Sequence, residues 1–193
     1  MAALHTEQLE FLLSNLVQLP ARTEVAGVFP ADLPPPKRRL NARDVCFILN
    51  TDPRGAPGAH WLAFYYDAAK QQLEYFDSFG LPLSFFRTVA QFLASRKLRI
   101  IPANTHGMLQ AIDTTACGYY CVLYLHYRAR FGSSIGAASK IARLARTQNT
   151  RDAAVVRTVH TLMHKHHCMN MPSVTACTRN SQQCKCYGDC QRM

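Results

Sequence analysis

Residues 117–131, CGYYCVLYLHYRARF, form a long and strongly apolar segment, and its burial is the first demand that the fold has to meet. Their composition predicts a helix that the rest of the chain has to cover. No window reaches the roughly 18–20 unbroken apolar residues that a membrane-spanning helix requires, so we expect no membrane insertion. With 193 residues, 48% of them hydrophobic, the chain can supply that cover without disulfides.

The helices and strands predicted elsewhere in the chain would form the layer that covers this helix. Apolar residues at helical spacing occupy 6–18. The prolines in 19–43 exclude a regular helix and favour an extended connection. Further helices are predicted at 84–97, with Ser84 as N-cap, and at 137–147 and 151–167. Short strands are predicted at 45–49, 60–66, 72–77 and 98–101. The order predicts an α+β fold with a central, mostly antiparallel sheet packed by the 117–131 helix. We expect one domain over 1–168 and a Cys-rich basic tail over 169–193.

Positive charge is concentrated in the last third of the chain. Residues 127–193 hold 11 Lys+Arg against Asp152 and Asp189, a net charge of +9 out of the total of +10. Such a field attracts polyanions and favours non-specific DNA binding through 127–193; a solvated basic surface without a partner is the alternative. The N-terminus predicts no secretory signal, so we expect the eight cysteines to lie in a reducing compartment.

Cys117 is the candidate nucleophile because it stands where a loop, residues 113–116, meets the apolar helix. Unpaired N–H groups and the helix dipole favour a thiolate at that position. Gly118 is expected to leave room for a substrate carbonyl. The alternative is that Cys117 is an ordinary buried residue, which is the commoner situation for an intracellular cysteine.

A nucleophilic cysteine needs a base and a group that orients the base. His60 opens one predicted strand and Asp77 closes the next, 17 residues later. A hairpin between the two strands would place its outer ends side by side, which makes His60 and Asp77 neighbours. Gln110, seven residues before Cys117, is the candidate oxyanion donor together with the Cys117 backbone N–H. Considered singly, each of these residues could be an ordinary structural one.

Three stretches together resemble the adenains, the cysteine endopeptidases of adenoviruses: residues 46–64, CFILNTDPRGAPGAHWLAF; residues 75–80, YFDSFG; and residues 110–121, QAIDTTACGYYC. The SUMO-processing proteases of the same clan are similar at a greater distance. The His-Trp pair, the step to the acid, and the spacing from Gln to Cys-Gly fit the adenain pattern, and the good match covers roughly residues 42–130. The resemblance implies the adenain fold, distantly related to papain.

Carried over by position, the resemblance implies Cys117 as nucleophile, His60 as general base and then acid, Asp77 as the group that orients the imidazole, and Gln110 in the oxyanion hole. Human-type adenains usually have Glu where this chain has Asp77. Adenains cut after small residues, commonly at Gly-Gly or Gly-X sites. The implied task is cleavage of viral capsid and core precursors during virion maturation, by a monomer located in the virion and the host nucleus.

Adenains are also stimulated by viral DNA and by a short peptide that a disulfide tethers to the enzyme. The tether position falls on Arg99 here, so the covalent link is missing, whereas the basic last third retains the charge for DNA. No other cofactor is expected. A deubiquitinase or SUMO-protease-like enzyme acting on host conjugates, and a basic DNA-binding protein with a protease-like fold, are the alternative functions.

The tail adds Cys177, Cys184, Cys186 and Cys190 to the His-rich end of the last predicted helix, which includes Cys168. Their spacing lacks the two-residue gap usual in zinc sites, so we expect thiols and no metal site. The tail could also act in cis as an activating strand, or form a disulfide with Cys46 or Cys121.

Overall fold

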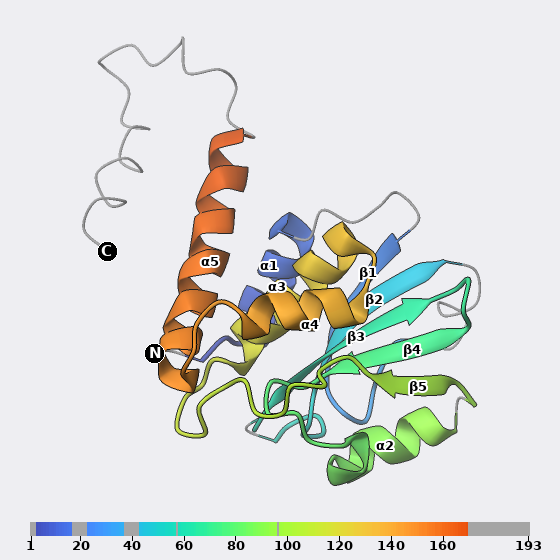
Figure 1. Ribbon diagram of the computed structural model, residues 1–193. Coiled ribbons are helices and arrows are strands. Elements are labelled where there is room, and N and C mark those ends of the chain that lie inside the picture. The colour runs from blue at the N-terminus through green and yellow to red at the C-terminus, as the bar shows by residue number, and fades with distance from the viewer. Residues whose placement is uncertain (1–2, 17–22, 37–42, 57, 96, 170–193) are drawn as a thin grey trace, which may run out of the picture.

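The computed structural model describes residues 3–16, 23–36, 43–56, 58–95 and 97–169. A five-stranded sheet is combined with helices in this part of the chain (Figure 1). The elements are α1 (Thr6–Leu16), β1 (Thr23–Phe29), β2 (Asp44–Asn50), β3 (Trp61–Asp67), β4 (Gln72–Phe76), the 3-10 turn η2 (Leu83–Phe85), α2 (Arg87–Ala94), β5 (Arg99–Pro102), α3 (Cys117–Phe131), α4 (Ser134–Ala142) and α5 (Gln148–Met169).

The sheet has its strands in chain order, from β1 at one edge to β5 at the other. The three central strands, β2, β3 and β4, are antiparallel. The edge strands pair in parallel, β1 with β2 and β5 with β4. The expected α+β fold is confirmed, with an antiparallel centre and parallel edges.

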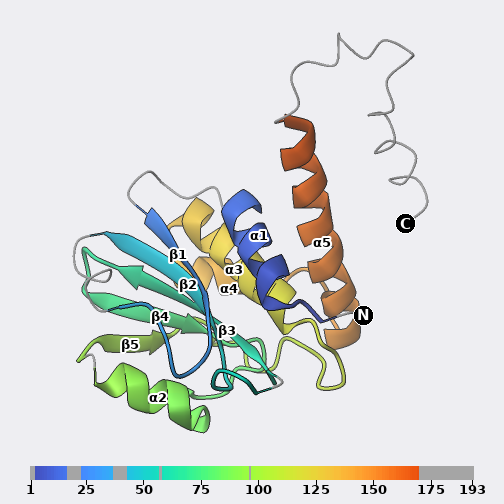
Figure 2. The ribbon, with the colours of Figure 1, turned by 180° about the vertical axis from the view of Figure 1, so that it is seen from behind.

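The two faces of the sheet bury different layers of helices. One face, which carries Cys46, Ile48, Ala63, Tyr65 and Phe76, belongs to the core formed with α1, α3, α4 and α5. The other face, lined by alternate residues such as Phe47 and Phe64, packs against α2. Figures 1 and 2 show these helices on opposite sides of the sheet. The period-two alternation of β2 and β3 therefore puts apolar side chains on both faces.

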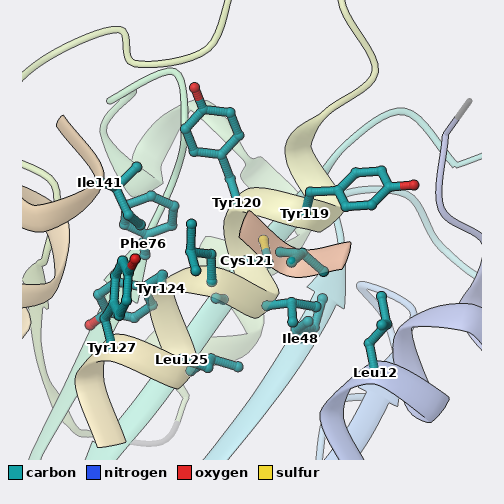
Figure 3. Packing of buried hydrophobic residues seen from close by; sticks show 14 of the residues in the cluster. Leu12, Ile48, Phe76, Tyr119, Tyr120, Cys121, Tyr124, Leu125, Tyr127 and Ile141 are labelled. Carbon is teal, nitrogen blue, oxygen red and sulfur yellow. The ribbon is translucent and has the colours of Figure 1, made fainter. Parts of the chain in front are cut away.

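Helix α3 lies at the centre of the larger core, as its composition predicts. Every residue from Cys117 to Arg128 is buried. Figure 3 shows α3 side chains among Leu12 of α1, Ile48 of β2 and Ile141 of α4. Arg128 is buried because its Nε and Nη2 atoms donate to Glu74 of β4 at 2.6 and 3.1 Å. Its charge is thus paired inside the fold and contributes nothing to the basic surface.

Several predicted boundaries are wrong. Residues 23–29 form β1, although only an extended connection, and no strand, was expected over 19–43. Ser84 lies in η2 and caps no helix; α2 begins after Phe86, which makes no side-chain cap. These errors share a cause, since the pairing of β1 with β2 and the packing of α2 on the sheet are tertiary contacts.

The last helix, α5, spans Gln148–Met169. The division into a domain over 1–168 and a tail over 169–193 stays a prediction. The predicted roles of the tail, including those of Cys177, Cys184, Cys186 and Cys190, lie outside the described residues. Cys46 and Cys121 are buried free thiols. None of the helices in the described ranges has the length and apolarity needed to cross a bilayer.

Candidate active site

The outer end of the β3–β4 hairpin brings two of the predicted site residues together. His60 directly precedes β3 and Asp77 directly follows β4, and the register pairs Ala63 with Phe76. As a result, His60 Nε2 lies 2.6 Å from Asp77 Oδ1. Both side chains are buried, with 8% of His60 and 1% of Asp77 exposed. The expected juxtaposition of His60 and Asp77 is therefore present.

Asp77 is fixed by backbone groups of the loop that follows it. Its Oδ1 accepts from the Phe79 N–H at 3.2 Å, and its Oδ2 accepts from the Leu81 N–H at 2.8 Å. The Asn104 side chain donates to the Asp77 carbonyl at 2.8 Å. The two N–H donors hold the carboxylate in one orientation, with Oδ1 aimed at the imidazole, and Asn104 holds the backbone of Asp77.

The imidazole of His60 is held on its face as well as at its edge. Phe79 and Phe86 stack on the ring, with centroids 4.8 and 5.9 Å away. Burial alone would lower the pKa of His60, but hydrogen bonds to Asp77 and Cys117, and the negative charges of both, raise that pKa to about 9. Since Asp77 occupies Nε2, Nδ1 is the nitrogen left for the Cys117 sulfur.

Cys117 is the first residue of α3, and no side chain caps this helix end. The backbone N–H groups of this first turn have no acceptor within the helix, and the Cys117 sulfur is hydrogen-bonded to the His60 imidazole. Burial raises the pKa of the Cys46 thiol to about 12 and the pKa of the Cys121 thiol well above its ordinary value. Among the three described free cysteines, only Cys117 has a hydrogen-bonded imidazole as an activating partner.

The predicted role of Gly118 is wrong. A Cβ placed on Gly118 would lie 3.1 Å from Leu4 Cβ and 3.3 Å from Leu9 Cδ2. The residue thus faces the segment around α1, and its lack of a side chain allows that segment to pack closely against α3. It leaves no room for substrate on that side.

Gln110 is fully buried in the loop before Cys117, and both ends of its amide are engaged. The Ser78 hydroxyl donates to Gln110 Oε1 at 2.7 Å. Gln110 Nε2 donates to the Thr114 carbonyl at 2.8 Å and lies 3.3 Å from the Thr114 hydroxyl. These contacts orient the amide so that its N–H bonds lie on the Thr114 side.

The residues that hold Asp77 and Gln110 in place were not predicted from the sequence. Ser78, Asn104 and Thr114 hold Asp77 and Gln110, and Asp152 of α5 binds the loop that carries Gln110. Of these four residues, only Ser78 directly follows a predicted site residue, Asp77, so only its position in the sequence could have indicated a role at the site. Within the described ranges, no three His, Cys, Asp or Glu side chains gather as a metal site requires.

Comparisons with known proteins agree on one family. The model of the adenovirus endoprotease family matches residues 27–184. The protease of porcine adenovirus A serotype 3 is 32% identical over 100 residues, which cover 46% of this chain and 49% of that protein. The protease of bovine adenovirus B serotype 3 is 29% identical over 140 residues, which cover 65% and 64%. The chain thus spans about half the length of the first of these relatives.

Solved structures show the fold alone. The central domain of the uncharacterized Lpg1148 protein from Legionella pneumophila superposes with a TM-score of 0.53 at 15% identity, over 84% of this chain and 99% of that one. The SUMO protease Ulp1 aligns with a TM-score of 0.47 at 14% identity, over 85% and 78%. The family match, in contrast, extends over most of the chain and contains every residue of the site described above, so the chain belongs to the adenovirus endoprotease family.

Proposed function

We propose that the protein is a viral cysteine endopeptidase with Cys117 as its nucleophile. One observation carries the proposal: the His60 imidazole is hydrogen-bonded to Asp77 on one side and to the Cys117 sulfur on the other, at the first residue of a buried helix. A nucleophile, a base and a group that orients the base are the parts that covalent acyl transfer needs. Family membership supports the same chemistry.

In the proposed cycle, the Cys117 thiolate attacks the carbonyl carbon of the scissile peptide bond. The new C–S bond forms, and the carbonyl oxygen becomes an oxyanion. Protonated His60 then gives its proton to the leaving amine as the C–N bond breaks. Neutral His60 next takes a proton from water, which attacks the acyl-enzyme and releases the acid product and the thiolate. Asp77 keeps Nε2 occupied throughout, so the reactive nitrogen is Nδ1.

The oxyanion would accept from the backbone N–H of Cys117 and from the side chain of Gln110. Gln110 Nε2 carries two N–H bonds, and it donates to the Thr114 carbonyl at 2.8 Å and to the Thr114 hydroxyl at 3.3 Å. We assign one N–H to these two oxygens, shared between them with the shorter bond to the carbonyl, and the second N–H to the oxyanion. Removing such a donor typically costs about 10²–10³ in turnover.

The proposed substrates are viral capsid and core precursors, cut after small residues at Gly-Gly or Gly-X sites during virion maturation. The supporting argument is membership of the adenovirus endoprotease family. We place the enzyme in the virion and the host nucleus, acting as a monomer.

DNA is proposed as a stimulating partner because exposed cations lie on the helices of the last third. Two arginines of this region, Arg128 and Arg151, are buried. Six cations on or between α3, α4 and α5 are exposed: Arg130, Lys140, Arg143, Arg146, Arg157 and Lys165. Binding through such residues would be non-specific and would weaken steeply with salt. Arg99, the exposed first residue of β5, offers no sulfur for a tethered activating peptide.

The test is cleavage of a fluorogenic Leu-Ala-Gly-Gly peptide by the wild type, by Cys117→Ala and by Cys121→Ala, each with and without duplex DNA. We expect turnover in the wild type and in the Cys121→Ala control, none in Cys117→Ala, and a salt-sensitive gain with DNA. Turnover without a DNA effect would retain the protease and remove the DNA proposal.

Two other outcomes point to the alternatives. Cleavage of ubiquitin-type fusions but of no virion precursor would indicate an enzyme acting on host conjugates. Absence of cleavage, with Cys117 inert to a thiol alkylator and with DNA binding unaffected by Cys117→Ala, would overturn the catalytic assignment and indicate a nucleic-acid-binding protein.

A further inference from the structure

The first turns of α5 hold the loop that carries Gln110. Gln148 Nε2 donates to the Met108 carbonyl at 3.0 Å, and Arg151 Nη1 donates to the Leu109 carbonyl at 2.9 Å. Asp152 Oδ2 accepts from the Ala111 N–H at 3.2 Å. A helix some forty residues further along the chain thus fixes the backbone on both sides of Gln110.

Asp152 is the most buried member of this group, with 1% of the residue exposed. Besides the Ala111 N–H, its Oδ2 accepts from the Thr114 hydroxyl at 2.7 Å, and its Oδ1 accepts from the Tyr120 hydroxyl at 2.7 Å. Three donors on two oxygens satisfy a buried carboxylate without a salt bridge, and hydrogen bonds to an ionised acceptor are stronger than neutral ones. None of these bonds is required by the acid–base pair of His60 and Asp77.

The contacts of Thr114 connect Asp152 with Gln110. The Thr114 hydroxyl has one proton, and the short bond to a carboxylate is the favoured place for it. Its lone pairs are then turned toward Gln110 Nε2, 3.3 Å away. The Thr114 N–H also bonds the Ala111 carbonyl at 3.3 Å, which closes the 111–114 turn. Asp152 therefore binds both ends of the turn whose carbonyl oxygen accepts from Gln110.

We propose that Asp152 is a positioning residue for the oxyanion hole, which acts by holding the 111–114 turn and, through Thr114, the amide of Gln110. The proposal rests on the proposed function, because it assigns a purpose to the orientation of Gln110. Asp152 itself contacts neither Cys117 nor His60 in the hydrogen bonds of the described residues. Its loss should therefore weaken stabilisation of the transition state while leaving activation of the thiol intact.

The mildest test is Thr114→Val, which removes the hydroxyl at nearly constant volume, with Thr114→Ser as the variant that restores it. We expect Thr114→Val to lower kcat roughly 10-fold with little change in KM, and Thr114→Ser to stay near the wild type. Asp152→Ala should lower kcat further, by up to about 10²-fold, with Gln110→Ala as the upper limit. The Cys117 alkylation rate should be unchanged in all of them.

Tyr120→Phe is the matched control, because it removes the third donor to the same carboxylate. The Tyr120 hydroxyl also lies 3.1 Å from the Leu109 carbonyl, but it has no hydrogen bond to the 111–114 turn. We expect its kcat to stay within about twofold of the wild type even if the protein is less stable. A loss of kcat equal to that of Asp152→Ala would indicate a general structural role and would overturn the proposal.

The decisive measurement is a double-mutant cycle. If Asp152 acts through Gln110, Asp152→Ala or Thr114→Val should cause no further loss of kcat in a Gln110→Ala background. An equal loss in both backgrounds would overturn the proposal. If Asp152→Ala does not fold, Asp152→Asn and Thr114→Val complete the cycle.

A second readout separates this proposal from the proposed function. The side-chain amide protons of Gln110 can be followed by NMR in protein whose Cys117 has been replaced by Ala. We expect Thr114→Val and Asp152→Asn to shift these resonances and to speed their exchange with solvent, and Tyr120→Phe to leave them in place. Absence of peptide cleavage by the wild type would contradict the proposed function. Gln110 resonances that do not shift in Thr114→Val and Asp152→Asn would contradict the positioning role of Asp152.

Discussion

The two halves of the candidate site are held in different ways. The half that contains His60 and Asp77 is built by one hairpin, and the carboxylate is fixed by N–H groups two and four residues further along. The half that contains Gln110 lies in a loop that is fixed by Ser78 on one side and by α5 on the other. Acid–base chemistry thus depends on local register, whereas oxyanion stabilisation depends on the docking of a distant helix.

This difference has a consequence for mutations. Changes in the hairpin half should alter the reactivity of the thiol itself, because His60 contacts Cys117. Changes in the loop half should alter turnover alone. The ratio of peptide turnover to alkylation by iodoacetamide therefore distinguishes the two halves.

The largest effect is expected for His60→Ala. Turnover should fall by about 10³-fold or more, because the thiolate loses its counter-charge and the leaving amine loses its acid. The rate of Cys117 alkylation at neutral pH should fall as well. A variant that lost turnover but was alkylated at the wild-type rate would contradict the assignment of His60 as the activating base.

Gln110→Ala should have the next largest effect, and on turnover only. We expect kcat to fall about 10²–10³-fold, since a donor to the oxyanion is lost. Alkylation forms no oxyanion, so its rate should match that of the wild type. A parallel loss of alkylation would show that the two halves are not separable.

Asp77→Asn should change how stability depends on pH. The pKa of His60 is raised in the folded protein from 6.5 to about 9, so its contribution to stability is complete below about pH 6.5 and is lost as the pH rises through 9. The free energy of unfolding of the wild type should therefore fall by up to about 3 kcal/mol between pH 6 and pH 10. Urea denaturation should show a smaller fall in Asp77→Asn, and equal falls would contradict the ion-pair interpretation.

The smallest effect concerns the contact between the two halves, where Gly80 approaches Gly107. Gly80 has φ +70°, and a Cβ there would lie 2.7 Å from the C and O atoms of Gly107. Gly132 at the end of α3 has φ +66° with nothing within 4 Å, so it serves as the control. We expect Gly132→Ala to cost about 1–2 kcal/mol of unfolding free energy and Gly80→Ala about 3 kcal/mol. Equal costs, measured by urea denaturation, would show that the Gly80–Gly107 contact can relax.

The elements that were predicted correctly are those whose pattern is local. The apolar run of 117–131, the aromatic-rich strands on either side of residues 68–71 and their antiparallel pairing all follow from composition, periodicity and a short turn. Strand β1 was missed because it pairs with β2 in parallel across a long connection, and its own residues do not indicate that pairing.

The amino-acid sequence alone predicts the candidate site residues, Cys117, His60, Asp77 and Gln110, and the proximity of His60 to Asp77, which the structure contains. Those properties need only one helix start and one hairpin, which short-range patterns specify. The tertiary structure decided how the groups are held: which nitrogen of His60 meets Asp77, that Gly118 receives the segment around α1, and that Asp152 binds the loop of Gln110. Such contacts join residues tens of positions apart, and their geometry exists only once the helices have packed on the sheet.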